Sequence, residues 1–95
     1  MNKTIVSGRL GNDVTYYPAK ANTKACARFS VAIDHRKDTP VTFIPVVAFG
    51  KNADVARDFL TKGKRCIFTT HVQPTYNKEG KTTGLEFVMD EVDFV

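Results

Sequence analysis

The sequence predicts one small all-β domain: a closed barrel of five antiparallel strands with a single α-helix between the third and fourth strands. Three observations lead to this fold class. The 95 residues are enough for one core and too few for two, so 1–95 reads as a single domain. Five segments have the composition or the alternation of β-strands. One segment between the third and the fourth changes to helical spacing.

The first three strands are expected at residues 2–10, 25–34 and 41–49. The first is rich in β-formers and ends at Gly11-Asn12-Asp13, a turn signal. In the second, alternate residues from Ala27 to Ile33 are apolar, and those between them include Arg28. Period two with one apolar side is typical of a half-buried strand.

The helix is expected over about ten residues, with Asn52 as its cap and Lys62-Gly63 as its stop. The side chains that recur at helical spacing, and so predict a buried stripe, are Ala53, Ala56, Phe59 and Leu60. The last two strands are expected at 64–73 and 83–95, joined by a polar hairpin tip at 77–81. Three strands, one helix and two strands is the order of the OB-fold, and barrel closure removes the open sheet edges.

Composition and motifs exclude several classes of function. No apolar run approaches the roughly 20 residues that cross a bilayer, and the N-terminus does not resemble a signal peptide, so we expect a cytoplasmic protein without a membrane partner. Cys26 and Cys66 are expected as reduced, buried thiols, because their spacing from the two histidines does not suit zinc. No catalytic motif is present, which predicts neither an enzyme nor a cofactor.

Charge is distributed unevenly along the chain. Residues 86–95 hold four acidic side chains and no base, which leaves 14 basic and 6 acidic side chains in residues 1–85, a net charge of +8. A body of this sign favours a polyanionic partner. It is equally typical of a soluble protein with a basic surface, so the charge alone leaves both readings open.

The third strand carries the most informative side chains. One of its faces consists of Phe43, Pro45, Val47 and Phe49, and the other of Thr42, Ile44, Val46 and Ala48. One apolar face must fill the barrel, so the other is covered by a partner subunit or offered to nucleobases. Phe43 and Phe49, followed by Lys51, fit a stacking platform beside a phosphate contact. The alternative is that both phenylalanines belong to the core.

Further candidates for a nucleic-acid site lie around the hairpin tip, the loop after the second strand and the end of the helix. Tyr76 precedes the hairpin tip and could stack on a base, or the hairpin could be an ordinary soluble one. The basic candidates are Arg28 on the second strand, Arg36, Lys37, Lys62, Lys64, Lys78 and Lys81.

Over nearly its whole length the chain resembles the bacterial and phage single-stranded DNA-binding protein family. The resemblance rests on the opening segment from Asn2 to Asp13, on Phe29-Ser30-Val31-Ala32 and above all on the stretch from Phe43 to Gly63. The most specific part of that stretch is Val46-Val47-Ala48-Phe49-Gly50-Lys51.

The resemblance implies roles for particular residues. Phe43 and Tyr76 lie where the family usually has stacking tryptophans, and Phe49 matches a stacking phenylalanine. Lys51 and Lys62 match lysines that contact the DNA backbone. The chain departs from the family in having no tryptophan, in Pro45 at an often basic position, and in lacking a stacking aromatic around His35 and Arg36. Smaller rings predict a lower affinity per nucleotide.

The family implies non-catalytic, largely sequence-independent binding of single-stranded DNA in replication, recombination or repair, by a homotetramer or alternatively a dimer. The last residues, Val92 to Val95, read as a barrel strand rather than as the family's acidic tail, so partners recruited by a tail are not expected. The expectation is a truncated chain or a naturally short form from a phage or mobile element. Two alternatives are a primosomal adaptor of the PriB type, which is a tail-less dimeric OB-fold, and a protein-interaction OB module.

Overall fold

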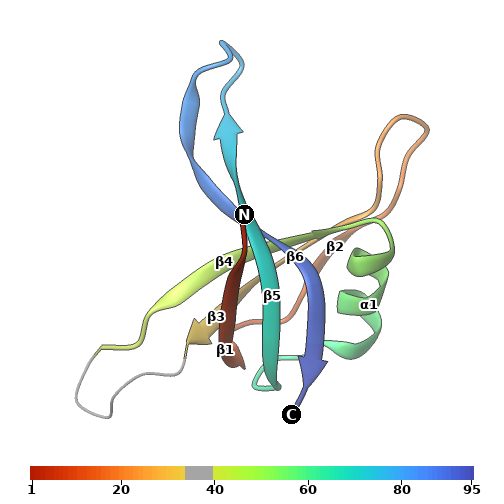
Figure 1. The fold of residues 1–95 in the computed structure, drawn as a ribbon. Helices are drawn as coiled ribbons and strands as arrows, with labels where there is room; N and C mark the ends of the chain where they lie inside the picture. Colours follow the sequence, from red (N-terminus) through yellow and green to blue (C-terminus); the bar gives the residue numbers. More distant parts are fainter. Residues whose placement is uncertain (34–39) are drawn as a thin grey trace.

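The computed structural model describes residues 1–33 and 40–95. This part of the chain contains six strands and one helix. They are β1 (Thr4–Leu10), β2 (Thr15–Tyr17), β3 (Cys26–Ile33), β4 (Phe43–Phe49), α1 (Lys51–Phe59), β5 (Arg65–Tyr76) and β6 (Thr82–Phe94). Figure 1 shows the strands wrapped around one core with α1 against one side of it. The predicted candidates Arg36 and Lys37 lie outside the described residues.

Five strands close into a ring in the order β1-β5-β6-β4-β3, and β3 pairs again with β1. The short β2 adds to β3 outside this ring. This arrangement confirms the predicted OB-fold barrel with its helix between the third and fourth barrel strands.

One pairing, β4 with β6, is parallel, whereas the sequence led us to expect antiparallel pairing throughout. The reason is geometric. Strand directions cannot alternate all the way around a ring with an odd number of members, so a closed ring of five needs at least one parallel pair.

Closure of the ring depends on a close approach of β1 to β3. Gly8 is paired with Ile33, and a Cβ atom on Gly8 would collide with the carbonyl of Ala32 and lie 2.9 Å from the Cα of Ile33. Only glycine allows two backbones to come this close. Only the end of β3, from Val31 to Ile33, pairs with β1. The start of β3, from Cys26 to Arg28, pairs with β2 along the same edge.

The core fills the barrel from one side of each strand. The rings of Phe29 on β3 and Phe68 on β5 lie 5.6 Å apart between centroids, and Met89 of β6 is buried with them. The buried residues of α1, Ala53 and Ala56, join the same cluster. Small side chains there let the helix pack close to the sheet, as the helical spacing predicted.

Two details of the predicted helix are wrong. The cap is Gly50, with φ at +60°, and Asn52 does not cap; its side-chain amide donates instead to the carbonyl of Met89 at 3.1 Å. This bond ties the start of α1 to β6. Phe59 is not on the buried stripe but is 56% exposed, with its ring 6.2 Å from that of Phe94.

β5 and β6 extend beyond the barrel as a two-stranded arm, which projects from the body of the molecule in Figure 1. The sequence placed the end of β5 at Gln73, but pairing continues to Tyr76 opposite Thr82. The turn signals at 77–81 are at the tip, where the Asn77 carboxamide oxygen accepts bonds from the backbone N–H groups of Glu79 and Lys81.

Both cysteines are free thiols; Cys66 is buried as expected, whereas Cys26 is only partly buried. In residues 1–33 and 40–95 no group of three or more histidine, cysteine or acidic side chains could hold a metal ion. None of the helices in these residues is long and apolar enough to cross a membrane.

Gly8→Ala is expected to lower the free energy of unfolding by about 1–3 kcal/mol, because β1 and β3 must separate to admit the methyl group. The matched control is Gly84→Ala, where a Cβ would lie 3.6 Å from the hydroxyl oxygen of Thr75, an ordinary contact. That variant should stay within about 0.5 kcal/mol of the parent. Urea denaturation measures both, and equal effects of the two substitutions would contradict the proposed role of Gly8.

Candidate nucleic-acid interface

The outward side of β2, β3 and β4 forms one continuous surface, which we call the outer face. Strand register places its side chains in rows, because residues paired across antiparallel strands point to the same side. The rows are Tyr17–Cys26–Phe49, Thr15–Arg28–Val47, Ser30–Pro45 and Ala32–Phe43. Val47 is the exception in exposure, because it points to this side but is buried. The intervening residues, such as Ala27, Phe29 and Val46, point into the core.

Phe43 and Phe49 both lie on the outer face, as the alternation of their strand predicted. Phe43 is 57% exposed, and its ring edge packs over Gly11, where a Cβ would lie 2.8 Å from Cε1 of the ring. Phe49 is partly buried, and neither ring belongs to the buried core cluster. The alternative that both phenylalanines fill the core is therefore wrong.

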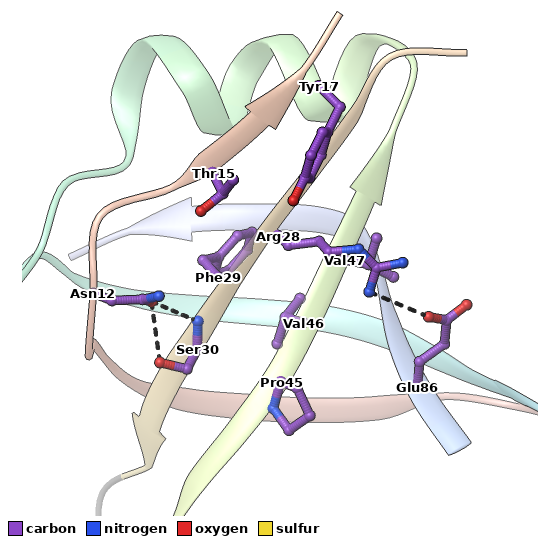
Figure 2. A pocket seen from close by; sticks show the side chains of 10 residues that line it. All are labelled: Asn12, Thr15, Tyr17, Arg28, Phe29, Ser30, Pro45, Val46, Val47 and Glu86. Atoms are coloured by element: carbon purple, nitrogen blue, oxygen red, sulfur yellow. Dashed lines mark hydrogen bonds and ion pairs between the residues drawn. The ribbon is translucent and has the colours of Figure 1, made fainter. Parts of the chain in front are cut away.

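A hollow of ≈ 360 Å³ occupies the centre of the outer face. Figure 2 shows its lining, with Tyr17 and Thr15 at one end and Asn12, Ser30 and Pro45 at the other. The Asn12 carboxamide oxygen accepts bonds from the backbone N–H of Ser30 at 2.8 Å and from its hydroxyl at 3.1 Å. These two bonds fix the turn after β1 against the outer face.

One cation and one carboxylate meet on the β6 side of this hollow. The guanidinium of Arg28 lies 3.9 Å from the carboxylate of Glu86, which also accepts a 2.7 Å bond from the amide of Gln73. The Arg28 side chain is 58% exposed, so this long ion pair is weak and leaves the guanidinium accessible. Arg28 can therefore contact a phosphate or a base edge on the outer face.

β2 is held in place from its inner side by α1. The hydroxyl of Tyr16 donates to the carboxylate of Asp54 at 2.7 Å, and the guanidinium carbon of Arg57 lies 4.7 Å from the centre of the Tyr16 ring. The hydrogen bond to Asp54, together with partial burial, raises the pKa of Tyr16 above 10.0. Because side chains alternate along a strand, fixing Tyr16 inward turns Thr15 and Tyr17 outward.

The predicted lysines are not all on the outer face. Lys51 begins α1, directly after Phe49 and Gly50, and is exposed. Lys62 lies beyond the other end of the helix, where its backbone N–H donates to the carboxylate of Asp13 at 3.1 Å, beside the Asn12 turn. Lys64 differs, because its ammonium group lies 4.6 Å from the centre of the Phe94 ring, an arrangement typical of a cation–π contact.

Tyr76, Lys78 and Lys81 are brought together at the end of the β5–β6 arm. All three are exposed, and Tyr76 has 63% of its surface accessible. They belong to the arm and not to the rows of the outer face. The aromatic side chains that the sequence predicted to stack on bases thus lie on two separate parts of the described structure, the outer face and the arm.

A model of the single-strand binding protein family matches residues 1–95. The chain belongs to this family. It is 34% identical over 104 residues to single-stranded DNA-binding protein 2 of Clostridium acetobutylicum, covering 100% of this chain and 77% of that protein. It is 31% identical over 103 residues to the single-stranded DNA-binding protein of Fusobacterium nucleatum, covering 99% of this chain and 66% of that protein.

The relative named single-stranded DNA-binding protein in Clostridium perfringens is 28% identical over 99 residues. This chain is aligned along 100% of its length and spans 66% of that relative. Membership of the single-strand binding family confirms the resemblance that the residues between Phe43 and Gly63 suggested.

The sequence did not single out Tyr17 of the outer face, nor Lys20 and Lys24 of the β2–β3 connection, as candidates for the interface. A strand of three residues is too short to show a period, so the sequence predicted no element at Thr15–Tyr17. One usable signal was present. Residues 14–33 contain Lys20, Lys24 and Arg28 and no acidic side chain, which marks a basic strip in this member of the single-strand binding family.

Proposed function

We propose that this chain binds single-stranded DNA and protects it during replication, recombination or repair, without catalysis and largely without regard to base sequence. The observation that carries the proposal is the exposure of Phe43 on an outer face that also presents Phe49 and Arg28. Single strands are bound by aromatic rings that stack on bases and by cations that follow the phosphates. Membership of the single-strand binding family supports the same ligand.

In the proposed mechanism, bases stack on Phe43 and Phe49 of the outer face and on Tyr76 of the arm. Phosphates are paired with Arg28, Lys51 and Lys62, and near the arm with Lys78 and Lys81. Every base has a flat face and every nucleotide has a phosphate, so these contacts read little sequence. Lys64 would contribute only if DNA displaced it from the ring of Phe94.

The full-length family match favours this role over that of a primosomal adaptor of the PriB type. The family is a DNA-binding and non-catalytic one, and we extend that property to this chain as part of the proposal. A cytoplasmic location, where such DNA would be met in a bacterium, is a further part of it.

We further propose that the chain forms a homotetramer, with a dimer as the alternative. Ile5 of β1 and Ile67 of β5 point outward from the barrel, and Ile5 is 64% exposed, so these strands offer apolar surface to a second copy. Sedimentation velocity should show an assembly larger than a monomer, and Ile5→Lys should shift it to a smaller species. A monomeric parent protein would contradict the proposal.

The test of the function is a fluorescence-anisotropy titration with labelled oligo-dT of about 35 nucleotides, beside a duplex of equal length. We expect tight binding to the single strand that weakens with salt, with a log–log slope of about −0.7 per phosphate contacted. Equal affinity for the duplex, or no affinity for either, would contradict the proposal. The second outcome would favour a protein-interaction module.

Phe43→Ala is expected to weaken oligo-dT binding by about 1–3 kcal/mol, the usual contribution of one stacked base. Phe59→Ala is the matched control, because Phe59 is 56% exposed against 57% for Phe43 but lies on α1, away from the outer face. The control should leave the affinity unchanged. Similar losses in both variants would mean that Phe43 has no specific role.

A further inference from the structure

A second hollow lies on the outer face, on the other side of Tyr17 from the central one. It has a volume of ≈ 660 Å³. Its lining consists of Tyr17, Pro18, Lys20, Thr23, Lys24, Cys26 and Phe49. Apart from Phe49, none of these residues is among those that the sequence or the family resemblance assigned to DNA binding.

The two aromatic rings of this hollow stand on opposite sides of a small residue. Tyr17 is paired with Cys26, and Cys26 is paired with Phe49, so the three share one row and point to the same side. Adjacent strands are about 4.8 Å apart, which places the Tyr17 and Phe49 backbones about 9.6 Å from each other. Stacked rings have centroids at least about 4.5 Å apart. The gap therefore has the width for one planar ring between two others.

The floor and the rim of the hollow suit a nucleotide. Cys26 is short and uncharged, so it leaves the gap open. Lys20 and Lys24 lie in the β2–β3 connection, whose turn is fixed by bonds between the backbones of Lys20 and Thr23 at 3.0 and 3.3 Å. A Cβ on Gly50 would lie 3.9 Å from Cδ of Lys24, so the Lys24 side chain passes close to the residue that caps α1. No ion pair joins Lys20 or Lys24 to a residue in 1–33 or 40–95.

We propose that this hollow is a subsite for one nucleotide, in which the base inserts between Tyr17 and Phe49 above Cys26 and the flanking phosphates contact Lys20 and Lys24. The subsite rests on the proposed binding of single-stranded DNA and adds a second stacking partner to the base on Phe49. Its walls are apolar rings, so it accepts any base. Tyr17 also forms a wall of the central hollow, so one strand can run from this subsite across Arg28 toward Phe43.

The experiment compares the parent protein, Tyr17→Ala and Tyr17→Phe in oligo-dT titrations, with circular dichroism to confirm that each variant is folded. Tyr17 is 51% exposed, so neither change should disturb the core. We expect Tyr17→Ala to bind about 5- to 150-fold more weakly, as for the loss of one stacked base, and Tyr17→Phe to bind like the parent. Equal binding by all three variants would overturn the subsite while leaving the binding function in place.

Cys26 provides a second measurement that does not depend on affinity. Cys66 is fully buried, and burial raises the pKa of its thiol, so in the native protein a maleimide reagent should label Cys26 alone. Saturating oligo-dT should slow the labelling of Cys26 at least several-fold in the parent. Unchanged labelling in a protein that is demonstrably bound to oligo-dT would overturn the subsite. Failure of the parent to bind oligo-dT would overturn the proposed function itself.

The phosphate contacts of the subsite have their own matched pair of variants. Lys24→Ala should reduce the salt slope of oligo-dT binding by about 0.7, the change for one phosphate on a single strand. Lys3→Ala removes another exposed lysine, which precedes β1, and it should leave the slope unchanged. Equal slopes in the two variants would remove Lys24 from the subsite.

Discussion

Closure of the five-strand ring is the constraint on which the rest of the structure depends. Gly8 lets β1 meet β3, and the parallel pairing of β4 with β6 completes the circuit that an odd number of strands requires. Once the ring is closed, one side of every strand is committed to the core. The opposite side of β2, β3 and β4 is thereby turned outward, with its side chains in fixed rows.

These rows explain how a rigid barrel could bind a flexible ligand. Strand register, and not a loop that folds around the DNA, sets the positions of the Tyr17 and Phe49 rings and of the Arg28 guanidinium in the rows of the outer face. Because these side chains are already held in place in the free protein, less conformational entropy is lost when DNA binds. The contact of Tyr16 with Asp54 extends this order to β2, which among the strands of residues 1–33 and 40–95 pairs only with β3.

Much of this arrangement could be predicted from the sequence, because long strands carry a clear period. Alternation in β4 correctly separated Phe43 and Phe49 from Val46 and Ala48. Shorter or non-local features could not be predicted. Three residues of β2 show no period, and the role of Asn52 depends on the carbonyl of Met89, which is distant in sequence. The surroundings of a lysine side chain are set by residues that are distant in sequence. Lys64, for example, contacts the ring of Phe94, which the sequence did not predict.

The central claim is that the outer face, and not another side of the barrel, receives the single strand. Backbone amide NMR of the labelled protein during a titration with oligo-dT tests it most directly. We predict the largest shift changes at Tyr17, Arg28 and Phe49 and along the neighbouring strands, with small changes at Ile5 and Ile67 on the β1–β5 side. Changes concentrated on β1 and β5, with β2 to β4 unaffected, would contradict the account.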